Sequence, residues 1–194
     1  MTEKEKMLRG MLYDADDSTL CADRVRAKEL CHAYNQLRPS DAAGMRELLQ
    51  RLLGETGETF CVTAPFWCDY GYNIRLGEHF YANHNLVILD CAAVTFGEHV
   101  FVAPNCGFYT AGHPIDAECR ERGLEYAYPI TVGDHVWIGG GVQVMPGVTI
   151  GRNVVIGGSS VVVKDIPSDS VAVGNPCRVI RPITEADKQT CWDR

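Results

Sequence analysis

Hydrophobic residues recur with a period of six along residues 130–165. In blocks of six, the first position holds Ile130, Val136, Val142, Val148 and Val154, and the third position holds Val132, Ile138, Val144, Ile150, Ile156 and Val162. Apolar residues two positions apart point to the same side of a strand, and the glycine that follows in most blocks permits the dihedral angles of a sharp corner. A chain that turns a corner every six residues winds into a coil. The pattern therefore predicts a parallel β-helix.

Earlier parts of the chain keep the same phase with interruptions. One triplet of blocks begins at Ile74, Phe80 and Leu86, and a second begins, after two alanines are skipped, at Val94, Val100 and Cys106. Three blocks make one triangular coil of 18 residues, and successive coils should stack at the strand spacing of roughly 4.8 Å. We therefore expect a mainly β fold, with the β-helix over residues 58–166 and a protruding loop at 112–129 that keeps no phase.

The two ends of the chain do not follow the repeat. Within residues 1–57, apolar residues at helical spacing follow a possible cap at Ser18 or Thr19, and a second helix should start after Pro39. These helices should pack on an open end or flank of the β-helix. Residues 167–194 suggest two strands, 171–174 and 177–181, joined at Asn175-Pro176 and followed by a short helix.

Stacking the coils superimposes three histidines, His79, His99 and His135, at the first corner of the triangle. An exposed ladder of corner residues explains them best. A metal stack is the alternative, but no other residue at this corner offers a cysteine or a free carboxylate with ligand spacing.

The second corner is rich in small residues. Its four levels are 83–85, 103–105, 139–141 and 157–159, with Ala103, Gly140 and Gly158 among them. Such a column leaves a shallow groove in which an extended ligand can approach the backbone closely. Glycine required only for tight corners explains the same residues equally well.

The unphased loop leaves the β-helix at the third corner, and His113 stands at its base between Gly112 and Pro114. Long ordered loops in compact domains are usually functional, and this histidine is not generated by the repeat. We interpret it as catalytic in preference to a surface residue. Further on, Lys164, Arg178 and Arg181 concentrate positive charge near one end, as phosphate groups at the end of the groove would require, although surface solvation also explains such a trio.

Composition narrows the classes of function. The chain has 194 residues and a formal net charge of -7, which disfavours binding to nucleic acid. It contains no run of 18 apolar residues and its start carries no apolar signal segment, so we expect neither a membrane span nor secretion. The nine cysteines form no CxxC pair and suggest free thiols in a reducing compartment. A cytoplasmic location is the prediction.

Several motifs resemble those of the maltose and galactoside O-acetyltransferases, a branch of the hexapeptide-repeat acyltransferases, and the maltose type is the more similar. The resemblance covers essentially the whole chain. It includes the amino-terminal TEKEKML and RVRAKEL segments, CDYGYNI at 68–74, FYANHN at 80–85, TAGHPI at 110–115, PITVGDHVWIGGGV at 129–142, PGVTIG at 146–151, VKDIP at 163–167 and GNPCRVIR at 174–181. A hexapeptide run alone is weakly specific, whereas the amino-terminal segment together with CDYGYNI and the histidine loop is strongly specific.

This resemblance implies a left-handed β-helix that assembles as a homotrimer, with acetyl-CoA lying along the helix between neighbouring subunits. His113 would act as general base on a sugar hydroxyl, the 6-hydroxyl of maltose, glucose or a related saccharide. Asn83 matches a position that contacts both the cofactor and the reacting centre. Acceptor-pocket positions are matched by Asp69 and Tyr81, and positions along the CoA path by Asn83, Ala103, Gly140, Gly158, Lys164, Arg178 and Arg181.

Two departures from the family pattern stand out. Cys91 replaces the acidic residue of the galactoside type, which puts a preference for galactosides in doubt, and Val163 replaces the usual threonine before the lysine, which suggests one fewer hydrogen bond to CoA.

No Ser-His-Asp spacing or nucleophile elbow is present, so we expect direct transfer in a ternary complex, and we expect His113 to face the column through Asn83, Ala103, Gly140 and Gly158. Within the family, a xenobiotic or amino-acid hydroxyl is the alternative acceptor. A zinc hydratase similar to the γ-class carbonic anhydrases is a remote alternative, because His79 and His84 fall at different corners. A noncatalytic solenoid that only binds partners is equally remote. No metal is expected.

Overall fold

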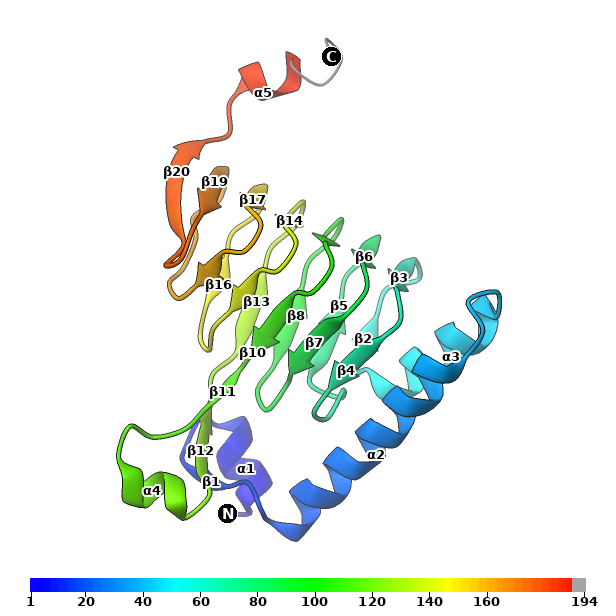
Figure 1. Ribbon diagram of the computed structural model, residues 1–194, viewed down its shortest axis with the longest axis vertical. Coiled ribbons are helices and arrows are strands. Elements are labelled where there is room, and N and C mark those ends of the chain that lie inside the picture. Colours follow the sequence, from blue (N-terminus) through cyan, green and yellow to red (C-terminus); the bar gives the residue numbers. More distant parts are fainter. Residues whose placement is uncertain (190–194) are drawn as a thin grey trace.

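The structure, a computed structural model, describes residues 1–189 as a three-faced β-helix with helices at its amino-terminal end (Figure 1). The first face contains β2 (Glu55–Thr56), β5 (Ile74–Leu76), β8 (Val94–Phe96), β13 (Ile130–Val132) and β16 (Thr149–Ile150). The second contains β3 (Phe60–Val62), β6 (Phe80–Ala82), β9 (Phe101–Val102), β14 (Trp137–Ile138), β17 (Val154–Ile156), β19 (Ser170–Val173) and β20 (Arg178–Pro182). The third contains β4 (Phe66–Cys68), β7 (Leu86–Leu89), β10 (Gly107–Tyr109), β15 (Gln143–Val144) and β18 (Val161–Val162).

Strand register confirms the predicted stacking of the coils. On the first face, Val94 pairs in parallel with Ile74 on one side and with Ile130 on the other. The first and third positions of the blocks point inward: Ile130 and Val132 are buried and Thr131 between them is exposed. Each aliphatic side chain buried in this way contributes about 1.5–3 kcal/mol, so the repeat supplies most of the core.

The β-helix is longer than the predicted 58–166. A coil formed by β2, β3 and β4 precedes the first predicted coil, with Phe60 opposite Phe80 and Phe66 opposite Leu86. At the other end β19 stacks in parallel on β17, with Val171 opposite Val155. Phe60 and Phe66 are six positions apart, as are Val62 and Cys68, so this coil keeps the period with aromatic residues in place of Val and Ile, and only β2 falls before the predicted start at residue 58.

Glycines at the first corner have a different role from the one predicted. The backbone adopts positive φ two residues later, at His79 (57°), His99 (53°) and His135 (57°). A Cβ at Gly77 would lie 2.4 Å from the carbonyl oxygen of Gly97 on the next coil. The glycine therefore permits close stacking of the coils rather than the turn itself.

Three helices precede the β-helix: α1 (Glu3–Leu8), α2 (Ser18–Gln36) and α3 (Ala42–Leu52). The predicted cap at Ser18 or Thr19 is wrong, because Asp17 accepts the N–H groups of Thr19 and Leu20. Val25, one of the apolar residues at helical spacing in this segment, is 59% exposed rather than part of the buried face. The expected packing of α2 on the first coil is confirmed: Tyr34 donates a hydrogen bond to the Val62 carbonyl.

The loop that leaves the third corner contains structure of its own. It forms β11 (Ala111–Gly112), α4 (Ala117–Glu121) and β12 (Leu124–Ala127), and β12 pairs on its other edge with β1 (Tyr13–Asp14) of the amino-terminal arm (Figure 1). The loop is therefore held by a three-stranded antiparallel sheet built from two distant segments.

At the carboxyl end, the two predicted strands are β19 and β20, which pair antiparallel, and the predicted short helix is α5 (Glu185–Gln189). The last part of the predicted 167–194 segment, residues 190–194 with Cys191, lies outside the described residues. Within residues 1–189, none of the helices has the length and apolar character needed to cross a bilayer.

Candidate active site

His113 lies immediately after β11, with 55% of its side chain exposed. Its Nδ1 is 3.3 Å from the carbonyl oxygen of Leu124, and its Nε2 is 3.8 Å from Oε1 of Glu125. A carbonyl oxygen can only accept, so this contact places the imidazole proton on Nδ1. Nε2 is then the nitrogen with a free lone pair, next to a carboxylate.

Glu125 is fixed by the amino-terminal arm. Its Oε2 accepts a hydrogen bond of 2.6 Å from the hydroxyl of Tyr13, which is its cross-strand neighbour between β1 and β12. Burial, and then the nearby Cys91 and Glu125, raise the pKa of Tyr13, so the phenol keeps its proton and remains a donor. The arm thus orients the carboxylate that faces the imidazole.

Asp69 follows β4 at the third corner, and its Oδ2 lies 3.6 Å from Sγ of Cys91. Burial raises the pKa of both Asp69 and Cys91, and the thiol accordingly remains a donor to the carboxylate. Arg24 of α2 opposes the shift at Asp69 through its positive charge. We refer to His113, Glu125, Tyr13, Asp69, Cys91 and Arg24 as the loop half-site.

A second group of predicted residues lies at the second corner or, for Tyr81, on the strand β6 that leads into it. We call Tyr81, Asn83, Ala103, Gly140 and Gly158 the column half-site. Asn83 and Ala103 line a shallow depression with Tyr81, Phe101 and Trp137. The side-chain oxygen of Asn83 accepts the N–H of His84 at 2.8 Å, which fixes the amide.

The two glycines of the column half-site require a correction. Backbone hydrogen bonds run from Gly141 to Pro104 and from Ser159 to Gly140, so Gly140 and Gly158 stack one residue further along than Asn83 and Ala103. Both glycines are exposed, and a Cβ at Gly140 would meet nothing closer than the Pro104 carbonyl at 3.5 Å. The backbone at Gly140 is accessible, as the predicted groove would require.

A single chain does not bring the two half-sites together. The second and third corners are separated by a strand of the third face, such as the four residues of β7, which span roughly 13 Å. The expectation that His113 faces the Asn83 column is therefore not met within one chain. Asp69 and Tyr81, assigned to one acceptor pocket, likewise lie in different half-sites.

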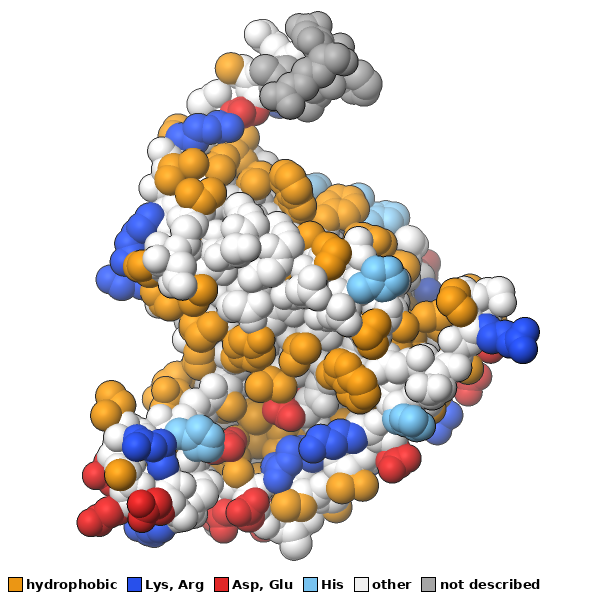
Figure 2. Space-filling view, in the orientation of Figure 1, with side chains coloured by type: hydrophobic (Ala, Val, Ile, Leu, Met, Phe, Trp, Pro, Cys, Tyr) orange, Lys and Arg blue, Asp and Glu red, His pale blue; other side chains and the backbone are white. Residues whose placement is uncertain are grey.

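The three predicted basic residues are exposed at the carboxyl-terminal end: Lys164 follows β18, and Arg178 and Arg181 are on β20. Blue side chains gather at that end in Figure 2. Arg181 forms a bidentate pair with Asp187, with distances of 2.9 and 2.8 Å, so much of its guanidinium already has a partner.

The corner histidines stack as a ladder. Ring centroids are 4.5 Å apart between His79 and His99 and 5.2 Å apart between His99 and His135, with rings 25° and 14° from parallel. Nitrogens on parallel rings lie side by side rather than converging on a point. Within residues 1–189, no group of three or more His, Cys, Asp or Glu side chains could hold a metal ion.

Sequence reasoning missed Glu125, Tyr13 and Arg24. Glu125 and Tyr13 are 112 positions apart and meet only because β1 pairs with β12. No periodic signal marks either strand, so only the tertiary structure identifies them.

Comparison with known proteins identifies the family. Residues 6–57 match the maltose acetyltransferase hexapeptide capping motif, and residues 129–164 match six repeats of the bacterial transferase hexapeptide. A Saccharomyces cerevisiae protein to which acetyltransferase activity is provisionally assigned is 55% identical over 187 residues, covering 96% of this chain and 95% of that protein. A maltose O-acetyltransferase structure from Clostridium difficile 630 is 50% identical with a TM-score of 0.94, covering 95% of this chain and 99% of the other. The chain belongs to the maltose and galactoside O-acetyltransferase family.

A second solved relative of this O-acetyltransferase family is a galactoside acetyltransferase in complex with coenzyme A. It is 43% identical with a TM-score of 0.94, and the match covers 97% of this chain and 94% of the other. The likeness over almost the whole length confirms the left-handed β-helix with its amino-terminal helical cap.

Proposed function

We propose that the protein transfers an acetyl group directly from acetyl-CoA to a sugar hydroxyl, the 6-hydroxyl of maltose, glucose or a related saccharide, with His113 as general base. The observation that carries the proposal is the pair of contacts at His113, because they leave Nε2 free to accept a proton beside the Glu125 carboxylate. The family's named activities and the relative that contains coenzyme A support the donor and the class of acceptor.

In the proposed step, Nε2 takes the proton of the sugar hydroxyl while its oxygen attacks the thioester carbonyl carbon. The C–S bond breaks as the new C–O bond is completed, and the imidazolium returns its proton to the departing sulfur. General base catalysis of this kind is typically worth ~100- to 10,000-fold. Glu125 would stabilise the imidazolium that forms, and Asn83 is suited to donate a hydrogen bond to the oxyanion.

The catalytic centre is completed between copies of the chain in this proposal. Phe101 and Trp137, which adjoin the column half-site, are 51% and 55% exposed, and exposed aromatic stripes mark interaction surfaces. A cyclic homotrimer would place the loop half-site of one copy against the column half-site of the next. Asp69 and Tyr81 would then line one acceptor pocket although they are apart within a chain.

Acetyl-CoA would lie along the column half-site in this arrangement. The accessible backbone at Gly140 and Gly158 suits an extended pantetheine arm, and Lys164, Arg178 and Arg181 would meet the phosphates. Arg181 would have to share its guanidinium with Asp187.

An assay of the free CoA released from acetyl-CoA identifies the preferred acceptor. Glucose, maltose, a thiogalactoside and serine are compared at equal concentration, and the sugars should give the highest kcat/KM. Serine as the best acceptor would overturn the sugar assignment while leaving the acetyltransferase intact.

Subunit mixing tests the shared site. His113→Ala and Asn83→Ala variants, each inactive alone, are unfolded together and refolded as mixed trimers. If each site takes one residue from each of two neighbours, random mixing restores about a quarter of the wild-type activity. Recovery of no activity, with trimers present by light scattering, would show that both residues act from one chain.

A further inference from the structure

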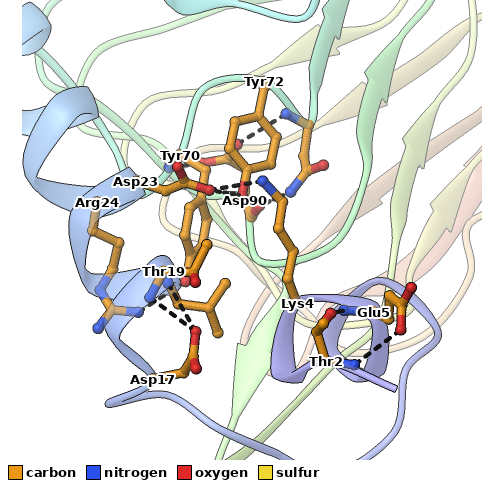
Figure 3. A network of polar contacts seen from close by, with 12 residues as sticks. Thr2, Lys4, Glu5, Asp17, Thr19, Asp23, Arg24, Tyr70, Tyr72 and Asp90 are labelled. Carbon is orange, nitrogen blue, oxygen red and sulfur yellow. Dashed lines mark hydrogen bonds and ion pairs between the residues drawn. The ribbon is translucent and has the colours of Figure 1, made fainter.

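Asp90 is a buried carboxylate at the end of β7 that has no part in the proposed chemistry. Its side chain is fully buried. Oδ1 accepts the backbone N–H groups of Tyr70 at 2.8 Å and Asp69 at 3.1 Å, and Oδ2 accepts that of Asn73 at 3.3 Å. The Asn73 side chain in turn donates to the Asp90 carbonyl at 2.7 Å. One residue thus holds the whole turn 69–73 (Figure 3).

This turn carries Asp69 of the loop half-site and contacts Arg24 through Tyr70. Asp69 is held by its own backbone N–H and extends toward Cys91. Tyr70, held at the next N–H, accepts a hydrogen bond of 2.8 Å at its hydroxyl from Nη1 of Arg24 (Figure 3). The position of Asp69 therefore depends on the bonds to Asp90, and so does one contact of Arg24, whose Nη2 also donates to the Ala15 carbonyl at 2.6 Å.

The buried negative charge of Asp90 does not favour the stability of the fold. Burial raises the pKa of Asp90 to about 6, more than the backbone N–H groups lower it. Thr110, at the corresponding corner of the next coil, is equally buried and meets the backbone with a neutral hydroxyl, which bonds Leu89 and Ala92. Because the corner can be built without a charge, the carboxylate at Asp90 calls for a role other than holding the fold.

We propose that Asp90 is a positioning residue for the acceptor, which fixes Asp69 and, through Tyr70, Arg24 in the geometry that binds the sugar. This inference rests on the proposed function, in which Asp69 contributes to the acceptor pocket. Asp90 itself touches neither substrate. Its loss should weaken sugar binding and leave acetyl-CoA binding at the column half-site unchanged.

The test is the steady-state kinetics of Asp90→Asn with both substrates varied. Asparagine keeps the size and one acceptor oxygen, but its NH₂ group opposes a backbone N–H and loosens the turn. Loss of about one such bond, near 1.4 kcal/mol, corresponds to a sugar KM raised ~10-fold. We expect kcat and the KM for acetyl-CoA to change less than ~3-fold, since a uniform binding contribution appears in KM.

Glu78→Gln is the matched control. Glu78 is also a corner carboxylate that holds a turn of the preceding coil, through the N–H groups of Glu58 and Thr59, but it belongs to neither half-site. Its sugar KM should stay at the wild-type value. An equal rise in both variants, or a fall in kcat alone in Asp90→Asn, would overturn the positioning role.

Asp69→Asn distinguishes a failure of the positioning role of Asp90 from a failure of the proposed acceptor pocket. If this variant leaves the sugar KM unchanged, the acceptor pocket itself is misassigned. If it raises the sugar KM and Asp90→Asn does not, the positioning role fails while the proposed function stands. Should Asp90→Asn not fold, Tyr70→Phe removes the hydroxyl that anchors Arg24 and should raise the sugar KM ~3-fold. An unchanged KM there would contradict the inference.

Discussion

The loop half-site and the column half-site are built in opposite ways. The loop half-site joins side chains from distant segments: the arm at residue 13, α2 at residue 24, coil corners at 69 and 91 and a loop at 113–125. Most of its polar groups are buried or partly buried. The column half-site repeats one backbone geometry and exposes it. The repeat therefore offers a regular surface for a long ligand, and reactive groups collect where the repeat is interrupted.

Replacing His113 should have the largest effect. His113→Ala removes the base and should lower kcat ~100- to 10,000-fold, while acetyl-CoA binding and assembly at the column half-site remain. His135→Ala is the matched control, because His135 belongs to the corner ladder and should retain full activity. Isothermal titration measures CoA binding, and a CoA-release assay measures catalytic activity. Activity retained in His113→Ala would refute the base assignment.

The pH dependence of stability should differ in sign between Asp90 and the exposed corner carboxylate Glu78. The folded-state pKa of Asp90, about 6, lies above the ordinary value of 3.8. Folding favours the protonated form of Asp90. Its contribution to the free energy of unfolding is therefore full below about pH 4 and falls by about 3 kcal/mol as pH rises through about 6. Relative to wild type, Asp90→Asn should therefore gain stability between pH 4.5 and 7.5.

Urea unfolding at the two pH values measures this difference. The charge of Asp90 helps to raise the pKa values of Cys68 and Tyr72, but both groups keep their protons throughout this pH range in either protein. Asp69 also has a raised pKa and its charge raises that of Asp90, so the measured difference reports the coupled pair. The pKa of Glu78 is lowered by backbone N–H groups, so its contribution is present above the ordinary pKa and lost in acid. The stability difference between Glu78→Gln and wild type should therefore change below about pH 4.5 and stay nearly level between pH 4.5 and 7.5. A gain in Glu78→Gln equal to that in Asp90→Asn over this range would contradict the contrast.

The sequence predicts the repeated coils well and the contacts of the loop half-site poorly. Stacking of Ile74, Val94 and Ile130 could be read from spacing, because a six-residue period fixes which side chains are buried. Strand β2 at Glu55–Thr56 could not, since neither residue is one of the apolar residues that mark the period. Glu125 and Tyr13 could not either, because strand pairing between distant segments leaves no local pattern.

Alanine substitutions at Gly140 and Gly77 should show separately the effects of ligand access and of coil stacking. Gly140→Ala adds a methyl group that meets no atom of its own chain within 3.5 Å, so stability should hold while the KM for acetyl-CoA rises ~10-fold through loss of close approach. Gly77→Ala places Cβ 2.4 Å from Gly97 and should cost about 1–3 kcal/mol of stability with an unchanged KM. Thermal unfolding and kinetics of both variants check the pair. Similar KM values for Gly140→Ala and wild type would place the donor elsewhere.

Tyr13→Phe should have the smallest effect and tests whether the amino-terminal arm acts on catalysis. Loss of the hydroxyl that holds Glu125 should lower kcat/KM ~5-fold. Tyr34→Phe is the control, because it removes a comparable hydrogen bond between α2 and the first coil, away from His113.

A double-variant cycle decides how Tyr13 acts. If Tyr13 works by orienting the carboxylate beside Nε2, its effect on kcat/KM should vanish in a Glu125→Gln background, because the two residues then belong to one interaction. If the ~5-fold loss persists there, Tyr13 only stabilises the sheet of β1, β12 and β11. The arm would then be a structural support for the loop half-site, and His113 would depend on Glu125 alone.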